Sequence, residues 1–239
     1  MLWSVLFLII LPIQAAKGKD AIRVGDFSSS VPGSLLPENW EALTFKKITT
    51  HTRYMVVEDT HTPVVKAVSD RSASGLIRKI RIDPEQYPVI KWRWKVTNIY
   101  QNGDVTQKSG DDYPARIYIT FEYNPEKAGF FERAKFSAAK LLYGEYPPSA
   151  AINYIWESKA PVGTVVPNPY TDNVQMIVTQ SGNEKINTWV EEKRNIFNDY
   201  IRAFGKKPPM ISGIAIMTDS DNTGEKAISY FGDIVMEPE

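Results

Sequence analysis

The sequence predicts a mainly β protein, a jelly-roll-like sandwich of two sheets with two short helical insertions. Three observations favour this class: period-two alternation recurs along most of the chain, turn residues separate the alternating segments, and helical spacing occurs in only two places. Many short strands in succession are typical of two packed antiparallel sheets. The predicted strands are Ile22–Phe27, Ala42–Ile48, Arg53–Glu58, Pro63–Ser69, Gly75–Ile82, Val89–Thr97, Ala115–Tyr123, Ala151–Glu157, Val174–Ser181, Trp189–Lys193, Ile211–Thr218 and Ala227–Met236.

Two segments have helical spacing instead. Pro125–Tyr143 carries apolar side chains at three- and four-residue intervals with basic residues around them, and Asn195–Phe204 is followed by Gly205 and two prolines. Glycine after the last turn and proline shortly beyond it are signals that end a helix. A basic amphipathic helix is able to contact lipid, but we expect the first segment to cover an open end of the sandwich.

The first sixteen residues contain no charged side chain and are apolar from Leu2 to Ile13. This run of about 12 residues is too short to cross a bilayer, which takes roughly 20. Because Ala15, Ala16 and a polar stretch follow it, residues 1–16 are expected to be a secretory signal peptide. The alternative is a retained N-terminal anchor, since no Lys or Arg precedes the run. We therefore expect export to the periplasm or the cell exterior, with no integral membrane segment after cleavage.

Residues 22–239 are expected to form a single domain, because neither a long linker nor an internal repeat divides them. The chain has no cysteine, which excludes disulfides, thiol nucleophiles and cysteine-containing metal sites. An exported protein without disulfides fits a bacterial envelope better than a small eukaryotic secreted module. Since 28 basic residues balance 28 acidic ones, neither nucleic acid nor an anionic membrane is an expected partner.

The predicted strand Val89–Thr97 has the clearest alternation in the chain. Trp92 and Trp94 share one face with other apolar residues, and three cations occupy the other face. The two tryptophans are expected in the core rather than on an exposed platform for sugar stacking. A row of like charges on one strand face is unfavourable unless acidic groups or a ligand lie opposite. The cations are Lys91, Arg93 and Lys95.

The next predicted strand, Ala115–Tyr123, has the same division, with Arg116 and Tyr118 on its polar face. If the two strands are neighbours with matched faces, these residues join Arg93 and Lys95 on one polar surface. The alternative is a solvated sheet face that a charged loop balances. We expect this surface to be the ligand-binding face of the protein.

Other polar residues are candidates for the border of such a site. Asp111 and Asp112 are adjacent in the loop before the second strand, where both carboxylates can face one cation. Tyr170 lies in a loop and can add a polar aromatic ring to a cleft. Arg194 is spaced to pair with Asp199, either beneath a site or as a surface pair of little energetic value.

A second acidic loop follows the predicted strand Ile211–Thr218. Asp219, Asp221 and Asn222 offer oxygen atoms near a glycine, as at the start of a calcium loop, but Tyr230 stands where an EF-hand has its final Glu. An EF-hand is therefore excluded, and a looser calcium site at Asp219 and Asp221 is the alternative to a hydrogen-bonded turn. We expect no cofactor, and we expect this loop to lie against the cationic face and neutralise it.

Several catalytic classes are excluded or gain no support. The two histidines of the chain have no G-x-S-x-G motif nearby, which argues against a serine hydrolase triad. Metalloprotease, phosphate-binding and dinucleotide-binding motifs are missing from the sequence. A glycosidase needs two carboxylates about 5 Å or about 6.5–9.5 Å apart, which the aspartates of the two loops can supply but which their spacing does not require.

Two resemblances accompany these patterns. The strings W-R-W-K-V, G-D-D-x-x-A-R-I-Y, N-Y-x-W, W…R-N…D-Y and T-D-S-D-N-T-G…Y-F-G-D-I together resemble the exported bacterial proteins of domain of unknown function 3047, from about Asp26 to the C-terminus. That resemblance implies a bacterial envelope protein of one domain and brings no reaction, ligand or catalytic residue. The Phe27…Trp40 opening and the last strand also resemble jelly-roll carbohydrate-binding modules, in which the first and last strands pair.

Two functions therefore compete. The leading hypothesis is a domain without catalytic activity that binds a carbohydrate or another polar ligand of the cell envelope. The rival is a glycan hydrolase or lyase that uses the clustered aspartates with Arg93, Lys95 and Arg116. A closed pocket that gathers these charges favours the enzyme, whereas an open groove lined by aromatic side chains favours binding.

Overall fold

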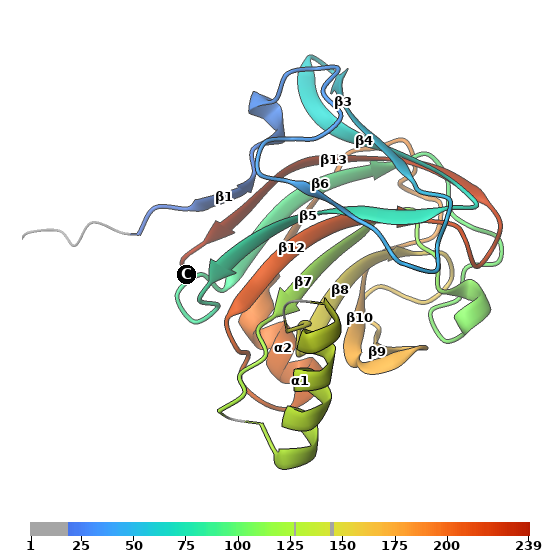
Figure 1. Ribbon diagram of the computed structural model, residues 1–239. Coiled ribbons are helices and arrows are strands. Elements are labelled where there is room, and N and C mark those ends of the chain that lie inside the picture. The colour runs from blue at the N-terminus through green and yellow to red at the C-terminus, as the bar shows by residue number, and fades with distance from the viewer. Residues whose placement is uncertain (1–18, 127, 144–145) are drawn as a thin grey trace, which may run out of the picture.

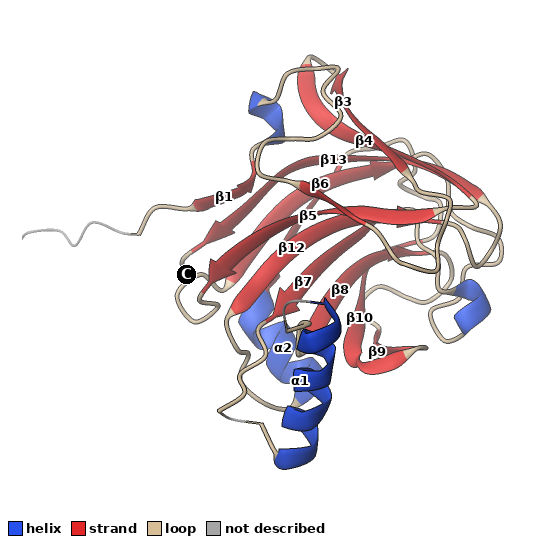
Figure 2. Cartoon of the chain, in the orientation of Figure 1, coloured by secondary structure: helices blue, strands red, loops and turns tan. Residues whose placement is uncertain are grey.

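The computed structural model describes residues 19–126, 128–143 and 146–239, in which two β-sheets pack face to face (Figures 1 and 2). This arrangement confirms the mainly β, jelly-roll-like sandwich with two helices. The expected signal peptide, residues 1–16, lies outside the described residues. Within the described part of the chain, no helix is both long and apolar enough to cross a bilayer.

The first sheet, called sheet A, contains both terminal strands. β1 pairs antiparallel with β13, as the resemblance to carbohydrate-binding modules implies. Across sheet A the order is β11 (Val190–Asn195), β6 (Val89–Val96), β13 (Lys226–Glu237), β4 (Thr62–Asp70) and β3 (Arg53–Asp59), with β1 (Ile22–Gly25) also beside β13.

The second sheet, called sheet B, has seven strands, and all neighbours are antiparallel except β8 and β10. The edge strand β9 was not predicted, because Pro167 interrupts its pattern; proline is tolerated at a sheet edge, where its missing N–H breaks no ladder. At the other edge, the observed strand Glu41–Leu43 has only three residues and is shorter than the predicted strand Ala42–Ile48. The order is β2 (Glu41–Leu43), β5 (Ala73–Ile82), β12 (Ile211–Asp219), β7 (Arg116–Phe121), β8 (Ala150–Glu157), β10 (Thr171–Ser181) and β9 (Val165–Asn168).

The two helices are α1 (Phe130–Tyr143) and α2 (Ile196–Phe204), and two short 3-10 turns cover Phe27–Ser29 and Lys108–Gly110. α2 begins where the Asn195 side chain accepts the Asn198 N–H at 2.9 Å, and it ends at Gly205 with a left-handed φ of 68°.

α1 begins at Phe130, later than the predicted helix Pro125–Tyr143. The chain before it forms a turn in which the Asn124 side chain accepts the Glu126 N–H at 2.9 Å. The helix is held to the strand region by Phe136, whose ring stacks on Tyr123 with 3.8 Å between centroids. Figure 1 shows α1 beyond the ends of the middle strands of sheet B.

Aromatic side chains from both sheets meet in the core. Trp92 and Trp94 of β6 are 3% and 0% exposed, which confirms that they are core residues. Trp92 stacks on Tyr154 with 5.2 Å between ring centroids, and Trp94 lies 6.0 Å from Trp156. Since Tyr154 and Trp156 belong to β8 of sheet B, these contacts join the two sheets.

β6 and β7 are not neighbours, so the single polar surface that their pairing would form does not exist. β6 pairs with β11 and β13 in sheet A, and β7 pairs with β12 and β8 in sheet B. The long connection between them, residues 97–115, crosses from one sheet to the other. Because each strand buries its apolar side against the other sheet, the polar sides of β6 and β7 face in opposite directions.

Trp94→Ala is expected to lower the free energy of unfolding by about 3–5 kcal/mol, because it leaves a cavity where the two sheets meet. Urea unfolding followed by circular dichroism measures this loss. Trp189→Ala is the matched control, since Trp189 is a half-buried residue on the outer side of sheet A, and its loss should be clearly smaller. Equal losses for the two variants would contradict the assignment of Trp94 to the core.

Candidate functional site

The polar residues of β7 lie on the outer face of sheet B, the face turned away from sheet A. Ile117 and Ile119 alternate into the core, so Arg116, Tyr118 and Thr120 point outward. Strand register places further residues on the same face: Asn153 of β8 and Ala215 of β12 both lie opposite Tyr118. This face is the first candidate for a binding surface.

At one end of the outer face, Arg116 forms a buried ion pair with Asp219 from the end of β12. Arg116 is 2% exposed, its Nε donates to Asp219 Oδ1 at 2.7 Å, and its Nη2 donates to Asp219 Oδ2. The same guanidinium donates from Nη2 to the Asp111 carbonyl at 2.5 Å and from Nη1 to Tyr118 Oη at 3.1 Å. Asp219 Oδ1 also accepts the Tyr113 N–H at 3.1 Å. The pair therefore ties two strands to the loop that precedes β7.

Burial and neighbouring charges act against each other in this pair. Burial opposes ionisation of Arg116, but Asp219, Tyr118 and Asp111 outweigh it and raise the pKa of Arg116 well above its usual value. Burial raises the pKa of the Asp219 carboxyl, and Arg116 opposes that rise. An isolated buried carboxylate costs several kcal/mol, so Asp219 depends on its cation.

Asp112 fastens the loop after β12 to the loop before β7. Its Oδ1 accepts the Asn222 side-chain N–H at 3.0 Å, and its Oδ2 accepts the Thr223 N–H at 2.6 Å and the Thr223 hydroxyl at 2.8 Å. Tyr170 donates its hydroxyl to Asn222 Oδ1 at 2.9 Å, although its ring is 56% exposed. Asp112, Tyr170 and Asn222 therefore do come together, where three loops meet.

Asp111 completes the polar layer beneath these loops. Its Oδ2 accepts the Asn168 side-chain N–H at 2.9 Å, while its Oδ1 lies 3.7 Å from Arg116 Nη1 and makes no hydrogen bond. On the far side of this layer, a small apolar cluster of Val105, Tyr113, Ile155, Met176 and Val178 fills the space under loop 97–115. One half of the outer face of sheet B is therefore covered by packed chain.

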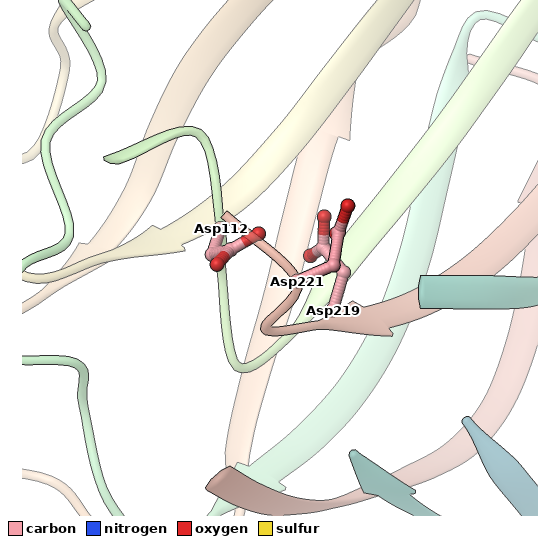
Figure 3. Close-up of side chains that lie close together, drawn as sticks. All are labelled: Asp112, Asp219 and Asp221. Atoms are coloured by element: carbon pink, nitrogen blue, oxygen red, sulfur yellow. The ribbon is translucent and has the colours of Figure 1, made fainter. Parts of the chain in front are cut away.

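Carboxylate oxygens of Asp112, Asp219 and Asp221 lie within 4.8 Å of one another, and they come from two different loops (Figure 3). The oxygens of Asp112 and Asp219 already accept hydrogen bonds from backbone and side-chain donors. Only Asp221 lacks a cation or a donor from another residue within the described part of the chain. Burial, and then the charge of Asp112, raise the pKa of Asp221. These contacts fit a hydrogen-bonded turn that Arg116 neutralises better than they fit a calcium site.

Arg93 and Lys95 lie far from this cluster, on the outer face of sheet A. Lys95 Nζ is 2.8 Å from Asp59 Oδ1, and the Arg93 guanidinium stands over the Trp189 ring at 4.6 Å. Lys91, the third cation of the row, pairs with Glu237 at 2.7 Å. The expectation that the Asp219–Asn222 loop neutralises both Arg116 and these cations is therefore wrong for the cations of β6. Lys91 and Lys95 have acidic partners in sheet A, whereas Arg93 stacks on Trp189.

Arg194 also lies apart from the Arg116 cluster. Its Nε and Nη2 donate to the two carboxylate oxygens of Asp199 at 2.9 and 2.6 Å, and Asp199 also accepts the Tyr154 hydroxyl at 2.8 Å. Because Tyr154 points into the core between the sheets, this group braces the start of α2 against sheet B. These contacts favour the bracing pair over a place for Arg194 on the outer face of sheet B.

The uncovered half of the outer face holds a cleft of about 710 Å³ over the middle strands of sheet B. Tyr118 lines it next to the Arg116 layer, and Tyr123 and Tyr146 line it near α1. Of all the lining residues, only Tyr118 was predicted to belong to the site, because small polar residues at scattered positions form no motif and only strand register brings them together. The other polar residues of the lining are Thr44, Thr120, Asn173 and Ser212, together with Glu41, Lys79 and Glu122.

Comparison with known proteins finds a matching family and similar solved structures. The family described as protein of unknown function (DUF3047) matches residues 38–235. No curated protein matches the chain significantly. Among solved structures, a native family 12 xyloglucanase from Bacillus licheniformis is 10% identical, with 94% of this chain and 99% of that chain covered and a TM-score of 0.40. The carbohydrate recognition domain of Emp47p is also 10% identical, with 90% and 94% covered and a TM-score of 0.41.

Asp221→Asn is expected to stabilise the protein at pH 7, by up to about 1 kcal/mol, because burial and repulsion from Asp112 outweigh the attraction of Arg116 for this half-exposed carboxylate. The folded-state pKa of Asp221 is raised, so its ionised form destabilises the fold at neutral pH, and this effect disappears as pH falls below about 4.

Urea unfolding of the parent protein and Asp221→Asn, at pH 7 and below about pH 4, measures the difference in their free energies of unfolding. Asp172→Asn, a change at an exposed carboxylate of β10, is the matched control and should show no such gain. If Asp221→Asn instead destabilises the protein, and a chelator lowers the melting temperature of the parent protein alone, the cluster holds a cation.

Proposed function

Given that the chain belongs to the family described as protein of unknown function (DUF3047), we propose that the outer face of sheet B binds a carbohydrate. The observation that carries this proposal is the open cleft of about 710 Å³, which combines three tyrosines with hydroxyl and amide groups. Its volume lies in the range of small-molecule sites.

The side chains of the cleft suit a ligand that is apolar on one side and rich in hydroxyl groups on the other. Tyr118 and Tyr146 are half-buried. Lys140 stands over the Tyr146 ring at 4.5 Å, so the remaining exposed part of each ring is the surface offered to the apolar side of a sugar. Thr120 Oγ1 and Ser212 Oγ lie 2.9 Å apart at the centre of the cleft, and Asn173 adds an amide at its border. These groups are able to donate and accept hydrogen bonds with sugar hydroxyls.

The charged residues of the cleft favour a ligand without net charge. Lys79 pairs with Glu41 at 3.1 Å, and Glu122 accepts a hydrogen bond from Arg81 at 2.7 Å. Each carboxylate of the lining therefore already has a cation beside it. A neutral oligosaccharide disturbs neither pair, whereas a strongly charged ligand must compete with them.

The rival proposal, a glycan hydrolase or lyase, has less support. The aspartates assigned to it are held in the Arg116 layer, and Arg93 and Lys95 lie on the other sheet. The carboxylates of the cleft itself, Glu41 and Glu122, face cations, whereas a glycosidase needs a general acid that stays protonated. The charges are not gathered in one closed pocket, so binding without catalysis is the better explanation.

The proposed setting is the cell envelope. This part of the proposal rests on the apolar leader expected at residues 1–16, which would direct the protein to the periplasm or the cell exterior, where polysaccharides are abundant. Neutral oligosaccharides from envelope polysaccharides are therefore the first ligands to test.

A glycan array should identify an oligosaccharide that binds, and calorimetry then measures its affinity. Tyr146→Ala is expected to weaken binding about tenfold, because one aromatic contact of the cleft is lost. Thr120→Val, which keeps the side-chain shape and removes the hydroxyl, should weaken it as well.

Tyr170→Ala is the matched control, since Tyr170 is exposed and lies outside the cleft, and this variant should bind like the parent protein. Mass spectrometry of the incubated oligosaccharide should find it intact. Failure of every glycan to bind, or equal losses in the two tyrosine variants, would contradict the proposal.

A further inference from the structure

A second concavity, here called the edge groove, lies between the N-terminal loop and the edge strand β3. Its volume is about 540 Å³, and its lining includes Leu35, Leu36, Met55 and Leu76. Two backbone hydrogen bonds of 2.8 Å, from Gly33 N–H to the Val56 carbonyl and from Val56 N–H to the Ser34 carbonyl, fix the loop beside β3. The leucines that follow Ser34 are therefore held at the rim of the groove.

The rim of the edge groove exposes large aliphatic side chains. Leu35 is 71% exposed, Leu36 45% and Met55 42%, whereas Leu76 is 1% exposed and belongs to the main core. The groove therefore leads from an apolar rim toward the core between the sheets. A single exposed leucine is ordinary on a protein surface, but several around one concavity indicate a site for an apolar ligand.

The charges of the edge groove have one sign. Arg53 and Lys66 are part of its lining, and the lining contains no Asp or Glu. Among the described residues, no carboxylate lies within ion-pair distance of either cation. Asp70 is close enough to feel the charge of Arg53, but it pairs with Lys226 at 2.8 Å. Two cations without acidic partners beside an apolar groove are complementary to an anionic head group on an apolar chain.

We propose that the edge groove binds a long-chain carboxylate, that is, a fatty acid. Its hydrocarbon chain lies along Leu35, Leu36 and Met55, and its carboxylate lies at Arg53 and Lys66. The edge groove shares Ala42 and Thr44 with the proposed carbohydrate cleft, but none of the residues assigned to the fatty acid lines that cleft. The two proposals therefore stand or fall separately.

Calorimetry with saturated fatty acids of 8 to 16 carbons, each below its micelle concentration, tests the proposal on the purified full chain. Each added methylene should tighten binding about fourfold until the groove is filled. The methyl ester of the best fatty acid should bind at least about tenfold more weakly, because it lacks the negative charge. Binding that does not saturate, or that ignores chain length, would overturn the proposal.

Charge variants locate the site. Arg53→Glu with Lys66→Glu should weaken binding of the fatty acid at least about tenfold and leave binding of the methyl ester unchanged. Lys185→Glu, at an exposed lysine in another loop, is the matched control and should have no effect. Equal effects of the control and the double variant would contradict the assignment of the head group.

Leu35→Asp places a charge on the apolar rim without disturbing the core. It should reduce the affinity for the fatty acid and leave the melting temperature unchanged. If sedimentation instead shows a dimer of the parent protein that Leu35→Asp dissociates, with no binding of fatty acid, the groove is covered by a second copy of the chain and the proposal is wrong.

Discussion

The buried ion pair between Arg116 and Asp219 is the interaction on which the outer face of sheet B depends. A guanidinium and a carboxylate are stable at this depth only if nearly every donor and acceptor is used, which fixes the loop before β7 and the loop after β12. The apolar cluster under loop 97–115 packs on one side of the pair, and the open cleft begins at Tyr118 on the other. The pair therefore sets the boundary between covered and uncovered sheet, and it holds one wall of the cleft in place before any ligand arrives.

Much of the fold follows from alternation in the sequence. The pattern of β6 predicted the buried tryptophans, and the pattern of β7 predicted an outward Arg116 and Tyr118. Alternation assigns each residue to a face, but it carries no information about which strands pair, so the pairing of β6 with β7 was left as a condition that the structure does not meet. The edge strand β9 was not predicted, because it contains Pro167 and proline normally argues against a strand. Edge positions are the exception, since they tolerate proline.

The candidate site was predictable where charges had to be balanced and unpredictable elsewhere. Asp219 pairs with Arg116, as its need for a cation predicts. Lys95 and Lys91 of β6 instead pair with Asp59 and Glu237, which belong to sheet A. Local partners of this kind cannot be foreseen without strand register. The same holds for Thr120 and Ser212, which belong to different strands and share the cleft only because β7 and β12 are neighbours.

The central claim is that a carbohydrate binds on the outer face of sheet B and not at the cations of β6 on the outer face of sheet A. Amide chemical shifts in a two-dimensional nitrogen-proton spectrum, followed during titration with a bound oligosaccharide, test this claim most directly. We expect shifts that concentrate at Tyr118, Thr120 and Ser212 and spare β6 and β11. Shifts centred on Arg93, Lys95 and Trp189 would contradict it.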